Sequence, residues 1–141
     1  MSTLQFLVCL TSVALVASKF LDCWSTASQM DGIDDETNPL ARAAMQRFGP
    51  GAAIWGVFAV VLLIVAIVGG SAYWGAGELA AASEPTIRTL DLVAVWGYLV
   101  LGMGISVVQV AVAHTNWRKR FNPISRTVLR VSRWIGALLR R

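Results

Sequence analysis

The chain has 141 residues, of which 56% are hydrophobic and 14% carry a formal charge, and its net charge is +4. With a mean hydropathy of +0.62, this composition excludes a disordered segment and an ordinary soluble domain and is typical of an integral membrane protein.

The first element is an apolar stretch over residues 4–22, interrupted only by Lys19. A lysine near the end of a membrane helix can extend its long stem so that the ammonium reaches the headgroups. The small residues Val16-Ala17-Ser18 would also fit a secretory signal peptide cleaved before Lys19. No Lys or Arg precedes the apolar run, which disfavours that alternative. We therefore expect a first membrane span over residues 4–22.

Residues 23–51 form a polar loop that contains signals for one short helix. Asn38 is a suitable N-cap, Pro39 suits the first helical position, and Gly49-Pro50 is a stop signal. The acidic run at residues 34–36 precedes this helix, where negative charge interacts favourably with the helix dipole. Its apolar residues share one side, so we expect a helix that lies at the membrane interface.

Two later stretches, residues 52–74 and 92–113, contain 23 and 22 residues without any Asp, Glu, Lys or Arg. At a rise of about 1.5 Å per residue each would reach about 33 to 35 Å, enough to cross a hydrocarbon core of roughly 30 Å. They predict the second and third spans. Residues 75–91 are rich in Gly and Ala, and we expect them to form a short loop with a turn at Glu84-Pro85.

Small and polar residues recur along each expected span and predict helix packing, because close backbone approach and polar contacts drive helix association in lipid. In the second span they are Ala52, Gly56, Ala59, Ala66 and Gly70, spaced 4-3-7-4. In the third span they are Gly102, Ser106, Gln109 and Ala113, and another side carries Gly97, Gly104 and Ala111. The first span offers Thr11, Ser18, Asp22 and Ser25. The alternative is that Gly and Ala are simply common in membrane helices.

Residues 114–141 form a basic tail with eight Lys or Arg and no acid. The residues expected to bind the membrane surface are Arg118, Lys119, Arg120, Arg126, Arg130 and Arg133. After Pro123 the apolar residues recur at spacings of four and three, which predicts an amphipathic helix. Each basic residue near an anionic leaflet contributes ~1 kcal/mol of binding free energy. The strong apolar face favours the membrane over nucleic acid as the partner.

The predicted fold is an all-α membrane protein with a three-span domain at residues 1–113 and a basic cytoplasmic tail at residues 114–141. Three transmembrane helices are joined by a short interfacial helix and followed by the basic amphipathic C-terminal helix. Residues 1–113 carry four Lys or Arg and eight acids. Because basic residues near spans stay on the cytoplasmic side, we expect the C-terminus inside and the N-terminus outside the inner (plasma) membrane.

Candidate chemistry is sparse. His114 is the single histidine, and it could ligate haem, a chlorin or a metal, or lie at headgroup level as an ordinary polar residue. Oxygen ligands from nearby acids around a divalent cation are imaginable, but their spacing does not assemble a site. No HExxH, GxSxG, CxxC or GxxxxGK[ST] pattern occurs. We therefore expect no enzyme activity, no cofactor and no metal.

Two short motifs carry a resemblance to a known family. Asp22-Cys23-Trp24-Ser25-Thr26 has the form Asp-x3-Thr, and Glu36-Thr37-Asn38-Pro39-Leu40 has the form Glu-x-Asn-Pro. In these motifs the chain resembles a family of small uncharacterised prokaryotic integral membrane proteins, defined by a domain of unknown function. The resemblance implies a similar architecture and no particular reaction. The candidate polar site consists of Asp22, Thr26, Glu36, Asn38 and His114.

Three hypotheses for function follow. The leading one is a non-enzymatic membrane subunit that packs against and stabilises a larger inner-membrane complex. The second is a homo-oligomeric pore former that resembles phage holins in having three spans, an outside N-terminus and a basic inside tail. The third is a metal-dependent membrane enzyme that uses Asp22, Glu36 and His114.

Overall fold

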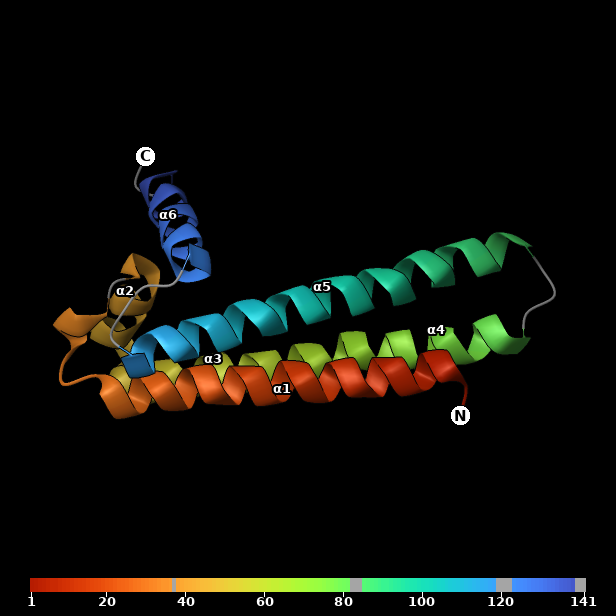
Figure 1. Cartoon of the computed structure of the whole chain (residues 1–141), viewed down its shortest axis with the longest axis horizontal. Coiled ribbons are helices and arrows are strands. Elements are labelled where there is room, and N and C mark those ends of the chain that lie inside the picture. Colours follow the sequence, from red (N-terminus) through yellow and green to blue (C-terminus); the bar gives the residue numbers. More distant parts are fainter. Residues whose placement is uncertain (37, 82–84, 119–122, 139–141) are drawn as a thin grey trace. The chain divides into compact units, whose positions relative to one another are not determined.

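The structure is a computed structural model that describes residues 1–36, 38–81, 85–118 and 123–138. Within these ranges the chain is helical and contains no strand, which confirms the all-α prediction. The elements, labelled in Figure 1, are α1 (Thr3–Gln29), η1 (Ile33–Asp35), α2 (Pro39–Phe48), α3 (Pro50–Ile64), η2 (Val65–Gly69), α4 (Gly70–Ala81), α5 (Pro85–Arg118) and α6 (Pro123–Leu138).

Three helical stretches are long and apolar enough to cross a membrane, as predicted: Thr3–Gln29, Pro50–Leu79 and Asp91–Arg118. The helices extend further than the apolar stretches. The predicted length of the loop at residues 75–91 is wrong, because α4 continues to Ala81 and α5 already begins at Pro85. A helical hydrogen-bond ladder is local and does not need apolar side chains, so it continues past the edge of the hydrocarbon. Glu84 of the expected turn lies outside the described residues.

Helix α2 begins and ends where its sequence signals predict. The Asn38 side chain accepts a hydrogen bond from the Leu40 amide at 3.1 Å, and Pro39 occupies the first turn. At the other end Gly49 has φ 84° and ψ 152°, a region open essentially to glycine alone. Its amide donates to the Met45 carbonyl at 2.8 Å. This conformation lets α3 start at Pro50 directly after α2.

The chain forms two compact units, the first made of residues 1–18 and 60–107 and the second of residues 19–59 and 108–141. In the first unit the beginning of α1 packs with α4 and the first half of α5 (Figure 1). Its buried core consists of Val8, Ala72, Ala76, Val95 and Leu99. Beside this core the Ser12 and Tyr98 hydroxyls are 2.7 Å apart, so a polar contact supplements the apolar packing.

Gly102 and Ser106, two of the residues expected in helix packing, are buried inside the first unit. A Cβ atom at Gly102 would lie 2.6 Å from the Thr11 Cγ2 atom and 3.2 Å from the Leu15 Cδ1 atom. Ser106 is buried, and its hydroxyl donates to the Gly102 carbonyl at 2.9 Å. The absence of a side chain at Gly102 therefore allows α5 to approach α1 closely, which is the expected role of glycine in membrane helices.

Most of the expected stripe of the second span is exposed in the part of the chain that the structure describes. Ala52, Gly56, Ala59 and Ala66 are exposed and Gly70 is partly exposed. The small residues that lie against other helices include instead Gly69, Ala72, Gly75, Ala76 and Gly77. The spacing assumes a regular α-helix, but η2 is a π-helix with more residues per turn. Residues beyond Ile64 therefore leave the line that Ala52, Gly56 and Ala59 share.

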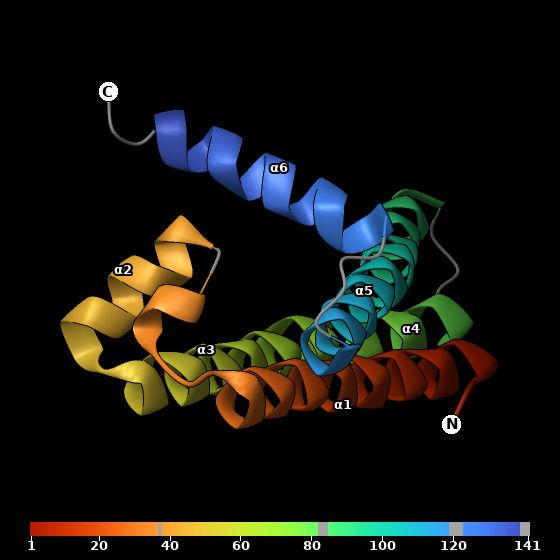
Figure 2. The same ribbon diagram turned by 60° about the vertical axis from the view of Figure 1, so that its left-hand side comes forward.

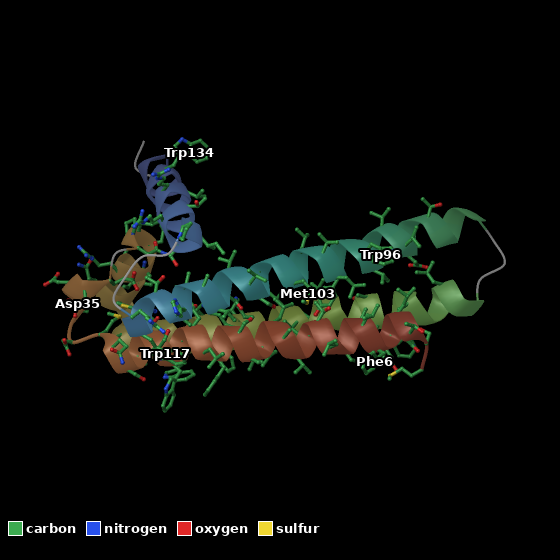
Figure 3. The ribbon with its side chains drawn as sticks, viewed as in Figure 1. Phe6, Asp35, Trp96, Met103, Trp117 and Trp134 are labelled. Carbon is green, nitrogen blue, oxygen red and sulfur yellow. The ribbon has the colours of Figure 1, made fainter. Side chains whose placement is uncertain are left out.

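Large apolar side chains point outwards from the spans. Phe6, Trp96 and Met103, which are labelled in Figure 3, each have about half of their surface exposed, at 52%, 48% and 50%. In the second unit Phe20 lies 6.0 Å from the ring centres of Trp24, Trp55 and Phe58. Such surfaces suit a lipid environment, and tryptophans favour its interfacial zone.

Candidate functional site

The second unit contains a cavity of about 760 Å³ that is partly open to the outside. Figure 2 shows α2 and α6 on one side of the neighbouring ends of α1, α3 and α5. These five helices, η1 and the loop residues between α1 and α2 supply the cavity lining. The buried residues Cys23, Met45 and Ile54 pack α1, α2 and α3 against one another. This small apolar core fixes the three helices on their side of the cavity.

One wall of the cavity carries an ion pair. The Lys19 ammonium contacts the Asp22 carboxylate at 2.7 Å, and the two side chains are only 14% and 16% exposed. Both residues belong to the α1 stretch that is apolar enough to cross a membrane. Ionisable residues in such helices are costly, face an interior or a water-filled cavity, and mark functional sites. The pair therefore places one positive and one negative charge in the lining of the candidate site.

A hydrogen-bond network joins α1 to the end of α5 beside this pair. The Asn116 side-chain amide donates to the Ser25 and Thr26 hydroxyl oxygens, both at 3.1 Å. Each hydroxyl in turn donates to the Asp22 carbonyl at 2.9 Å. Asn116 thus ties α5 to the same turn of α1 that carries the Lys19–Asp22 pair.

The loop before α2 supplies the acidic part of the lining. The Asn38 amide donates to the Glu36 carboxylate at 2.7 Å, and the Asp35 carboxylate accepts from the Asp31 amide at 3.0 Å. The Arg42 guanidinium donates to the Glu36 and Asp34 carbonyls, each at 2.9 Å. These contacts hold the loop against α2, and Asp31, Asp35 and Glu36 of the loop are among the residues that line the cavity. Figure 3 labels Asp35 at this loop.

The rest of the lining is mainly apolar. It includes Leu40, Met45, Ile54, Val57, Val108, Val112, Val128 and Leu129. Helix α6 is tied to α5 by the Thr115 and Ser125 hydroxyls, which are 2.7 Å apart. The apolar side of α6 therefore contributes Val128 and Leu129 to the lining, while Arg126 and Arg130 are exposed and do not line the cavity.

Four of the five residues of the candidate polar site meet at this cavity. Asp22, Thr26, Glu36 and Asn38 all line it, whereas His114 is exposed and lies outside the lining. The set of Asp22, Glu36 and His114 that was considered for a metal is therefore not assembled. Among the described residues no group of three or more His, Cys, Asp or Glu side chains could hold a metal.

The remaining site predictions divide in the same way. Gln109, expected in helix packing, lines the cavity. Asn116 and Lys19 were not predicted as site residues, and no local pattern in the sequence points to Asn116. Of the basic residues, Arg118, Arg126 and Arg130 are exposed as a surface-binding role requires. Lys119, Arg120 and the Arg133 side chain lie outside the described part of the chain.

In comparisons with known proteins, no family model, curated protein or solved structure matches the chain. The resemblance to a family of small membrane proteins thus remains an expectation from two short motifs. The conclusions on function depend on the geometry of the chain itself.

Proposed function

We propose that the protein is a non-enzymatic integral membrane subunit that packs through one face of α3 against another membrane protein. The observation that supports this is the exposure of Ala52, Gly56 and Ala59, which lie four and three residues apart on α3. A Cβ atom at Gly56 would meet no atom within 4 Å. Among the described residues, the small residues of this face therefore lie at the surface and are not buried by another helix.

A face of small residues on a membrane helix favours close packing against a second helix. In lipid the apolar effect does not drive one helix onto another, so small residues that admit a close second backbone are the main source of attraction. Glycine inside a helix costs about 1 kcal/mol relative to alanine. A helix that retains an uncontacted glycine at its surface gains from it when a partner helix covers it.

The basic tail completes the proposal. Arg118, Arg126 and Arg130 are exposed, and α6 is amphipathic, so the tail fits an anionic membrane surface. The positive-inside rule supports a cytoplasmic position for residues 114–141 at a plasma membrane, with the N-terminus outside. The proposed partners are anionic lipid and a second membrane protein.

Purification in a mild detergent tests the proposal. The tagged protein, expressed at low level in its native membrane, should elute with at least one stoichiometric membrane protein. Recovery as a lone monomer would contradict it. Recovery as a homo-oligomer whose induced expression depolarises the membrane would also contradict it, because those two properties together define the holin-like pore.

Substitutions locate the interface. Gly56→Leu places a large side chain on the proposed face and should abolish co-purification, because the partner backbone can no longer approach. Ala94→Leu is the control, since Ala94 is exposed on α5 and belongs to none of the small-residue sets described above. It should leave co-purification unchanged. Equal behaviour of the two variants would refute the assignment of the interface to α3.

A further inference from the structure

We infer that the cavity of the second unit binds a membrane lipid with an apolar chain and a primary-amine head group, the chemistry of phosphatidylethanolamine. The inference is independent of the proposed partner protein. It depends on the size of the cavity, on the division of its lining into apolar and charged parts, and on the sign of the charges.

The cavity has the size of a ligand site. Its volume of about 760 Å³ falls within the roughly 300 to 1,000 Å³ of sites that bury a small organic ligand. Its apolar lining comes from α2, α3, α5 and α6, including Met45, Ile54 and Val112. An apolar chain is the occupant that such a surface favours, because it removes the most apolar area from water.

The polar lining fits a zwitterionic head group. Four carboxylates line the cavity, from Asp22, Asp31, Asp35 and Glu36, against the single described ammonium of Lys19. Carboxylates accept strong charge-assisted hydrogen bonds from an ammonium group, whereas a quaternary amine has no N–H to donate. The Lys19 ammonium has three donors, of which the Asp22 contact uses one, and it is the complement of a lipid phosphate.

The positions of the arginines distinguish lipid binding in the cavity from electrostatic binding of anionic lipid at the protein surface. Arg126 and Arg130 are exposed on α6 and do not line the cavity, to which α6 contributes Ser125, Val128 and Leu129. An anionic lipid such as phosphatidylglycerol therefore suits the outer surface of α6. The carboxylate-rich cavity disfavours a head group that carries only negative charge.

Lipid retention measures the binding. The full-length protein is reconstituted with phosphatidylethanolamine, phosphatidylcholine and phosphatidylglycerol in equal amounts, extracted in mild detergent, and analysed by native mass spectrometry. Retained phosphatidylethanolamine should exceed its share of the mixture. Retention in the proportions of the mixture, or enrichment of phosphatidylglycerol or phosphatidylcholine alone, would overturn the inference.

A pair of adjacent substitutions on α2 tests the cavity itself. Ala44 lines it, whereas Ala43 is exposed and does not. Ala44→Phe fills part of the cavity and should reduce retained phosphatidylethanolamine to its share of the mixture, while Ala43→Phe should retain it like the unaltered protein. Circular dichroism checks that both variants keep their helical content. Equal retention by the two variants would place the lipid elsewhere.

A second pair tests the head group without changing the volume, so the inference stays falsifiable if Ala44→Phe does not fold. Glu36 lines the cavity and Asp34 does not. Glu36→Gln should lower the preference for phosphatidylethanolamine over phosphatidylcholine by up to about tenfold, the effect of one charge-assisted hydrogen bond. Asp34→Asn should not change it. An unchanged preference in Glu36→Gln would refute recognition of the amine by this carboxylate.

Discussion

Gly102 illustrates how one missing methyl group sets the packing of the first unit. The nearest atom to a Cβ at this position would be Thr11 Cγ2, at 2.6 Å. Thr11 is 3% exposed, and a β-branched side chain has few alternative rotamers. The contact can be relieved only by moving helices apart or by straining Thr11.

We expect Gly102→Ala to lower the free energy of unfolding by about 1 to 3 kcal/mol, the usual cost of overpacking a tight site. Thermal unfolding in detergent measures it. Gly104→Ala, at an open position, should leave the melting temperature unchanged or raise it. Combining Gly102→Ala with Thr11→Ser removes the clashing methyl and should restore most of the loss. An additive or larger loss in the double variant would contradict this explanation.

The sequence predicts part of the candidate site at the level of residues. Asp22 and Thr26 lie one helical turn apart, and Glu36 and Asn38 both directly precede the start of α2, so local spacing suffices to group each pair. Asn116 contacts Ser25 and Thr26 across about ninety positions of the chain, and no period or motif links residues so distant. The sequence predicts a similar depth in the membrane for His114, Asp22 and Glu36. Depth does not determine the direction of a side chain, and His114 does not line the cavity.

At the scale of elements, the junction between α2 and α3 depends on the backbone of Gly49. Its φ of 84° and ψ of 152° carry a cost of about 1 to 3 kcal/mol for residues with a side chain. No atom lies within 4 Å of a Cβ built there, so this cost comes from the backbone conformation and not from crowding.

Gly49→Ala should therefore loosen the junction and speed amide hydrogen exchange in α2 and at the start of α3. Gly51→Ala is the matched control, because Gly51 is helical, also has open space around it, and gains helix propensity from the change. It should slow exchange or leave it unchanged. Faster exchange in both variants, or in neither, would show that the left-handed conformation of Gly49 does not determine the junction.

The sequence predicts those elements whose ends are marked by local signals, and it misses those without such signals. Caps and stops are local signals, and Asn38, Pro39 and Gly49 define α2 in the structure as in the sequence. The π-helix η2 has no comparable signal. Its residues are almost all apolar, so their pattern does not distinguish 3.6 residues per turn from a larger number. The helix ends near Ala81 and Pro85 were also missed, since apolar content marks the hydrocarbon edge and not the last helical hydrogen bond.

At the scale of the whole molecule, the account depends on three helices that can cross a membrane and on an asymmetric charge distribution. The described spans are Thr3–Gln29, Pro50–Leu79 and Asp91–Arg118. Arg118 is the last residue of the third span, and seven more basic residues follow it in a segment, 114–141, that contains no acid. An odd number of crossings places the two ends of the chain on opposite sides, and the basic end should stay in the cytoplasm.

Site-directed labelling with a membrane-impermeant maleimide tests this threading most directly. In a chain with Cys9 and Cys23 replaced by serine, one cysteine is introduced at a time, as Thr3→Cys or Thr127→Cys, both at exposed positions. Thr3→Cys should be labelled in intact cells, and Thr127→Cys only after the membrane is permeabilised. Labelling of Thr127→Cys in intact cells, or of both variants to the same extent, would contradict the three-span threading with a cytoplasmic basic tail.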